Sequence, residues 1–170
     1  GAMETPESLG EAYHLLQAKA DVNYWIGRGL HAAGRIPEAS RHFEACAAEQ
    51  GDFAEMSVAF HSPLSYYRGL ALMELGRRDE ASALFRSLKS YGESKLGETA
   101  VIDYFATSLP NLLVFEEDLQ ARKEAEHCLL IALACHGLGE MGAARDALTR
   151  VFAFTNGDPH ANLLAKRLNA

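Results

Sequence analysis

The fold of this chain of 170 residues is decided by one stretch, GRGLHAAGRIPEASRHF, at positions 27–43. It opens with the small residue Gly27 and reaches Gly34 two helical turns later. Gly34 predicts a helix end there, because glycine adopts the left-handed conformation that commonly closes a helix. Ala39 and Phe43 then lie one turn apart on a following helix. The stretch therefore predicts two helices joined by a tight turn.

The same pattern occurs twice more, as GLALMELGRRDEASALF at 69–85 and ALACHGLGEMGAARDAL at 132–148. Each copy begins with a small residue, has its turn glycine seven positions later and its alanine five positions after that. The small residues allow two helices to approach closely. A large apolar residue and then a second apolar one complete each copy, and these pairs are Phe43 and Cys46, Phe85 and Leu88, and Leu148 and Val151. We expect the first residue of each pair to fill the gap to the next unit.

This pattern resembles the tetratricopeptide repeat (TPR), a helix–turn–helix unit of about 34 residues. The resemblance implies an all-α, right-handed superhelix, with three recognisable units and one irregular one in a single domain at 4–170. The turn glycines Gly34, Gly76 and Gly139 are 42 and 63 residues apart, so the repeats are not strictly tandem. The longer gap contains the irregular unit.

Helical spacing of apolar residues and the placement of Pro and Gly predict about nine helices. The stretch 53–62 is expected to be a loop, with a short helix at 54–60 as the alternative, and no alternation typical of strands is found. The expected helices cover 6–20, 22–33, 37–49, 63–75, 79–91, 99–108, 122–138, 142–154 and 159–168.

Composition and charge exclude several classes of protein. The chain has 16 Lys and Arg against 23 Asp and Glu, a net charge of −7, which argues against nucleic-acid binding. No apolar run approaches the roughly 20 residues of a membrane span. Three cysteines in a helical setting predict reduced thiols and a cytoplasmic location. Residues 1–3, Gly-Ala-Met, look like the scar of a cleaved tag.

The TPR resemblance implies a concave groove that binds a protein or peptide, lined by the first helix of each unit. Carried over position by position, the binding residues are Tyr24, Trp25, Arg28, His31, Tyr66, Tyr67, Met73 and Glu74. Tyr, Trp, Arg and Met are common at recognition surfaces. Arg28 and Glu74 would orient the partner. In the alternative interpretation, Trp25 and Tyr67 pack between neighbouring helices.

The sequence predicts no enzyme activity, cofactor or metal site. Cys128 and Cys135 lie seven residues apart and could share a helix face, but two ligands leave a tetrahedral metal site half empty. Glu124 and His127 have the spacing of a bundle metal motif, yet no second copy of it occurs. We expect Cys128 to pack in the core, as buried thiols commonly do.

Two other functions remain open. The phrase IDYFATSLPNLLVF at 102–115 is similar to the C-terminal TPR segment of large bacterial proteins that carry an uncharacterised, carbohydrate-related domain. That similarity implies an accessory segment that buttresses an upstream domain of the same chain. The other function is self-association into a homodimer, through the apolar stretch 109–115 or the C-terminal helix.

Overall fold

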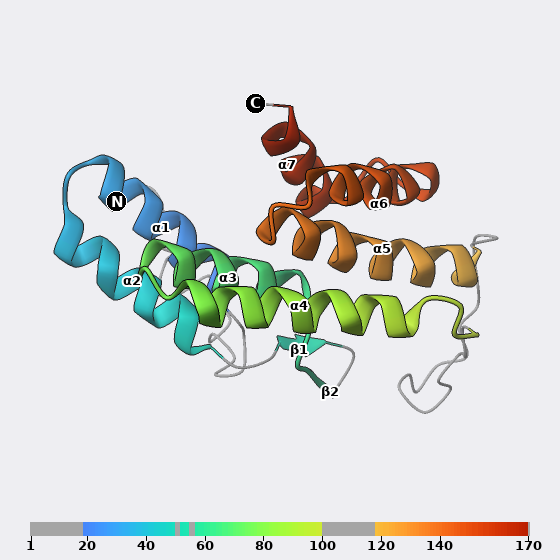
Figure 1. The fold of residues 1–170 in the computed structure, drawn as a ribbon, viewed down its shortest axis with the longest axis horizontal. Helices are drawn as coiled ribbons and strands as arrows, with labels where there is room; N and C mark the ends of the chain where they lie inside the picture. Colours follow the sequence, from blue (N-terminus) through green and yellow to red (C-terminus); the bar gives the residue numbers. More distant parts are fainter. Residues whose placement is uncertain (1–18, 50–51, 55–56, 100–117, 170) are drawn as a thin grey trace, which may run out of the picture. The chain divides into compact units, whose positions relative to one another are not determined.

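The computed structural model describes residues 19–49, 52–54, 57–99 and 118–169. Within these ranges the chain forms seven helices, in sequential antiparallel pairs, and one short β-hairpin (Figure 1). The all-α prediction is therefore confirmed apart from the hairpin. The elements are α1 (Ala20–Ala32), α2 (Ile36–Ala48), β1 (Asp52–Ala54), β2 (Ser57–Ala59), α3 (Pro63–Glu74), α4 (Arg78–Lys95), α5 (Leu119–Gly137), α6 (Met141–Phe154) and α7 (Pro159–Leu168).

The three predicted turns are present and equivalent. Gly34, Gly76 and Gly139 have φ angles of 75°, 75° and 80°, the left-handed region that glycine adopts without strain. After each glycine, the next backbone N–H donates to a carbonyl five residues back, which closes the preceding helix in a Schellman motif. These hydrogen bonds are Arg35 to Leu30, Arg77 to Leu72 and Glu140 to Cys135, each 2.9 Å.

The register of the three units is also confirmed by burial. Ala39, Ala81 and Ala144, which follow the turn glycines at the same interval, are at most 1 % exposed. The large and the apolar residues that complete the pattern are buried as well: Phe43, Phe85 and Leu148, then Cys46, Leu88 and Val151. Equivalent positions in sequence therefore have equivalent environments.

Apart from its repeats, the chain divides into two compact parts, and the division falls inside α4. From here on, the first unit is the part Gly1–Leu84 and the second unit is the part Phe85–Ala170. In the first unit, the core lies among α1, α2 and α3. Gly27 of α1 faces the ring of Phe43 on α2 so closely that a Cβ at this glycine would lie 2.6 Å from the ring. The small residue that opens the pattern thus makes room for the large one that ends it.

In the second unit, α5 is the central helix. It is buried over the continuous run His127–Cys135, as expected of a helical segment that is apolar on all sides. α6 pairs with it, and the last part of α4 packs against it at Gly92, where a Cβ would lie 2.8 Å from Ile131. α7 follows α6, and its first turn is capped by Asp158, whose carboxylate accepts from the N–H of Ala161 at 2.7 Å.

Two local predictions are wrong. The stretch expected to be a loop or a short helix forms an antiparallel hairpin, in which Phe53 pairs with Val58. Strands of three residues are too short to show the alternation that would identify them. Helix α4 also continues to Lys95, beyond the expected end at residue 91, and Gly92 lies inside the helix, where it packs closely against α5.

The expected helices at 6–20 and 99–108, and the irregular unit around 102–115, lie outside the described residues. The remaining seven expected helices are all present, with ends that differ by a few residues at most. Among the described residues, no helix combines the length and the apolar character needed to span a membrane.

Candidate partner-binding surface

The predicted binding residues lie on α1 and α3, which pack against each other in the first unit. Three of them are core residues: Tyr24, Tyr66 and Tyr67 are only 2–3 % exposed. The rings of Tyr24 and Tyr67 are 5.7 Å apart between centroids, and this contact joins α1 to α3. For these tyrosines the burial favours the packing interpretation, so any contribution to binding is through the positions of their neighbours.

Trp25 is half-buried at the edge of this aromatic cluster. Its ring meets that of Tyr24 edge to face, with centroids 5.3 Å apart and planes at 68°. Edge-to-face contact stabilises an aromatic pair beyond the area it buries. The indole ring of Trp25 is therefore held on one side by the buried Tyr24, while another part of the side chain is exposed to solvent.

Arg28 and Glu74 are brought together across α1 and α3. The Arg28 guanidinium donates to Oε1 of Glu74 at 2.8 Å, and a longer contact of 3.4 Å links it to the hydroxyl of Tyr24. Partial burial disfavours the charged guanidinium, but Tyr24 and Glu74 outweigh that effect, and the pKa of Arg28 is raised. The pair remains open to solvent, with half of the Arg28 side chain and a quarter of the Glu74 side chain exposed.

The other two predicted residues are exposed. Met73 of α3, which precedes Glu74 in the chain, is 42 % exposed, an unusual state for a methionine. His31 lies exposed in the last turn of α1, where a basic side chain interacts favourably with the helix dipole. We define the α1–α3 face as Trp25, Arg28, His31, Met73 and Glu74.

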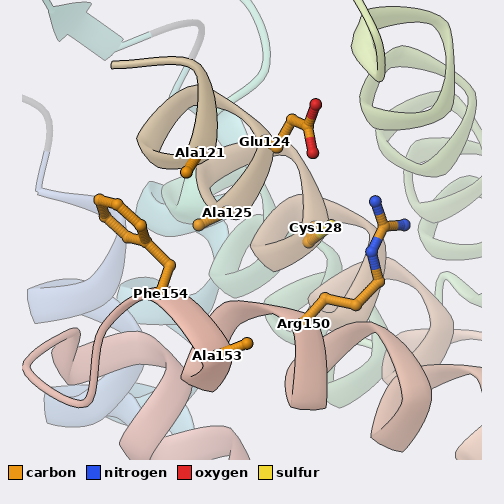
Figure 2. A pocket seen from close by; sticks show the side chains of 7 residues that line it. All are labelled: Ala121, Glu124, Ala125, Cys128, Arg150, Ala153 and Phe154. Carbon is orange, nitrogen blue, oxygen red and sulfur yellow. The ribbon is translucent and has the colours of Figure 1, made fainter. Parts of the chain in front are cut away.

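Sequence reasoning missed a hollow of about 180 Å³ between α5 and α6 (Figure 2). Its floor is made of small side chains, and the Phe154 ring lies at one side with Arg150 and Glu124 at another. Glu124 accepts a hydrogen bond from Gln120 Nε2 at 3.2 Å. The hollow arises because small residues from two helices face each other, a coincidence that spacing within either helix does not predict. The small residues are Ala121, Ala125, Cys128 and Ala153.

The thiols are packed as core side chains. Cys128 and Cys135 are at most 1 % exposed. Burial raises the pKa of Cys135 to about 11 and that of Cys46 to about 12, so both are held as neutral thiols near pH 7. Neutral thiols are poor nucleophiles and poor metal ligands. In the part of the chain that the structure describes, no three His, Cys, Asp or Glu side chains gather in a way that could hold a metal ion.

Comparison with known proteins gives no family for this chain. No family model matches its sequence, and no solved structure matches its fold.

Proposed function

We propose that the chain is a TPR-like repeat domain, without catalytic activity, that binds a protein or peptide through its α1–α3 face. The repeat assignment rests on three turns with the same φ angles and the same hydrogen bonds, in register with the same buried alanine. Units of this kind bury their apolar faces by stacking, which leaves a curved surface for binding. The right-handed superhelix is part of the same proposal.

The Arg28–Glu74 ion pair is the single observation that carries the choice of face. It holds both charges at fixed positions between two adjacent helices, at an N–O distance of 2.8 Å. An ion pair this exposed contributes only about 0–1 kcal/mol to stability. A charged group of a partner can therefore displace either side chain from the pair at small cost and form an ion pair with the other. The displaced side chain can then form an ion pair with an opposite charge on the partner.

The apolar part of binding comes from residues beside that pair. Met73 offers an adaptable apolar side chain, and methionines suit surfaces that must accommodate a partner. Trp25 adds an aromatic edge whose position is fixed by Tyr24. Aromatic anchors combined with arginine are typical of the residues that dominate binding energy. The partner is accordingly a peptide or domain with an apolar side chain next to charged groups of either sign.

The buried tyrosines make a poor test of this proposal, because truncating them would damage the core. The test variant instead carries Arg28→Glu and Met73→Ala, both at exposed positions. A matched control carries the same two exchanges in the second unit, Arg150→Glu and Met141→Ala, where both residues are also exposed. Both variants are checked for wild-type helical circular dichroism before use.

The measurement is affinity capture from a lysate of the source organism, with all three proteins as bait. The proposal expects a partner that the wild type and the control hold, and that the test variant loses at least tenfold. A partner lost only by the control would place binding at the α5–α6 hollow and contradict the α1–α3 face. Capture of nothing by any bait would favour the role of an accessory segment.

A further inference from the structure

A buried histidine, His127, lies where α4 and α5 pack together. His127 of α5 is only 9 % exposed. Its ring meets Tyr91 of α4 edge to face, at 85° and 6.4 Å between centroids. Gly92 is next to Tyr91, and a Cβ there would lie 3.1 Å from the carbonyl oxygen of His127. The backbones of α4 and α5 therefore approach closely beside this histidine.

The Nδ1 atom of His127 is buried and makes no hydrogen bond with any described residue. A neutral imidazole tolerates this, because one ring nitrogen can remain an acceptor without a proton. A protonated imidazole has a proton on both nitrogens, so the buried Nδ1–H would carry charge with no acceptor among the described residues. Burying a charged donor without a partner is far more costly than burying a neutral one.

The charges around the ring do not offset that cost. Two are acidic and two are basic: Glu126 and Lys123 on α5, Lys95 on α4 and Glu98 in the turn after α4. Both carboxylates are already engaged, Glu98 by Lys95 at 2.8 Å and Glu126 by Arg122 at 3.1 Å. Burial is accordingly the largest influence on His127 and lowers its pKa below the ordinary 6.5, ahead of Glu126 and the other charges.

We propose that His127 makes the α4–α5 contact sensitive to acid, so that its protonation favours a locally opened form of the second unit. In the opened form, residues Phe85–Lys95 separate from α5 and the imidazolium gains water as its acceptor. A histidine whose folded pKa is lowered contributes stability above its unfolded pKa of about 6.5. That contribution is lost as the pH falls through about 6.5 towards the folded pKa.

The first test uses the unaltered protein. The Hε1 resonances of the seven histidines are assigned and followed by NMR from about pH 8 to about pH 5. The proposal expects a His127 midpoint below 6.5, together with faster amide hydrogen exchange at 85–95 on acidification, after correction for the intrinsic rate. A midpoint at or above 6.5 would overturn the proposal, as would exchange at 85–95 that acid leaves unchanged.

The second test uses His127→Phe, which keeps a planar ring and removes the titrating group. Urea unfolding is compared at about pH 7.5 and about pH 5.5 for this variant, the wild type and a matched control, His31→Phe, at an exposed histidine. The acid-induced fall in the urea midpoint should shrink in His127→Phe and remain in His31→Phe. Some fall will persist, because burial also lowers the pKa of His136 on α5. An equal fall in all three proteins would contradict the proposal.

Discussion

Gly137 lies directly against the ring of Phe85: a Cβ at this glycine would be 2.5 Å from two of the ring carbons. Phe85 is 1 % exposed, so its ring is covered by neighbouring side chains and backbone. The contact joins α4 to α5 and explains why the last turn of α5 contains a glycine two residues before the turn glycine. Phe85, the large apolar residue of the second copy of the pattern, thus packs against the helix that opens the third copy.

Gly137→Ala should therefore destabilise the second unit. Overpacking a filled core typically costs about 1–3 kcal/mol, and the better helix propensity of alanine returns at most about 1 kcal/mol. Gly142→Ala is the matched control, because a Cβ at Gly142 of α6 meets nothing within 4 Å. Urea unfolding should show a loss for the first variant and no loss for the second. Equal stabilities would mean that Phe85 does not contact Gly137.

A similar comparison is available within α1. Gly27→Ala places a methyl group 2.6 Å from the Phe43 ring, whereas Gly29→Ala, one half-turn away, meets nothing within 4 Å. We expect Gly27→Ala to lower the free energy of unfolding by about 1–3 kcal/mol and Gly29→Ala to raise it by up to about 1 kcal/mol. Thermal and urea unfolding would measure these two changes in the free energy of unfolding, which should have opposite signs. Two stabilising substitutions would contradict the packing of α1 on α2.

The three turn glycines should behave alike. Gly34, Gly76 and Gly139 have nearly the same positive φ, and a Cβ at each has open space around it. Alanine there should cost about 1–2 kcal/mol from backbone strain alone. Asparagine tolerates this conformation better and should cost less than alanine at each site. A turn at which alanine costs nothing would not be equivalent to the others.

The Arg28–Glu74 pair should contribute little to stability. A double-mutant cycle with Arg28→Ala and Glu74→Ala, followed by urea unfolding, should give a coupling energy of about 0.2–1 kcal/mol, and less in high salt. This small value is what allows a partner to take over either charge. A coupling energy well above about 1 kcal/mol would mean that the pair is structural, and that a partner could not replace it cheaply.

The cysteines should be unreactive until the protein unfolds. Raising the pKa of the Cys46 thiol from 9.0 to about 12 lowers its thiolate fraction by about a thousandfold. With Cys128 and Cys135 also buried, a disulfide reagent near neutral pH should label the native protein only slowly. All three thiols should react quickly in urea. Rapid labelling of a native thiol would show that its helix opens easily.

The turns could be predicted from the sequence because glycine at a helix end has a local cause. The end of α4 could not, since Gly92 looks like a terminator in sequence but lies within the helix, where α5 approaches it. The hairpin was missed because three residues per strand are too few to show a period. At α4 a contact with a distant part of the chain outweighed the local pattern, whereas in the hairpin the local pattern was too short to identify.

The candidate site, like the fold, was predictable only in part. The sequence assigned Arg28 and Glu74 to the first helices of neighbouring repeats but did not predict their ion pair, because they occupy different positions of the repeat and only the packing of α1 on α3 brings them together. It could not distinguish the buried Tyr24 and Tyr67 from the partly exposed Trp25, since aromatic side chains suit both a core and a binding surface. Only the positions of α2 and α3 decide which ring is covered.

Site-specific photo-crosslinking tests the binding face most directly. A photoreactive phenylalanine analogue replaces Met73 in one protein and Met141 in another, two methionines exposed to the same degree, 42 % and 41 %. Both proteins are expressed in the source organism and irradiated there. The proposed function predicts a discrete crosslinked product from position 73, absent or at least tenfold weaker at position 141. A product from position 141 alone, or equal products from both, would contradict binding at the α1–α3 face.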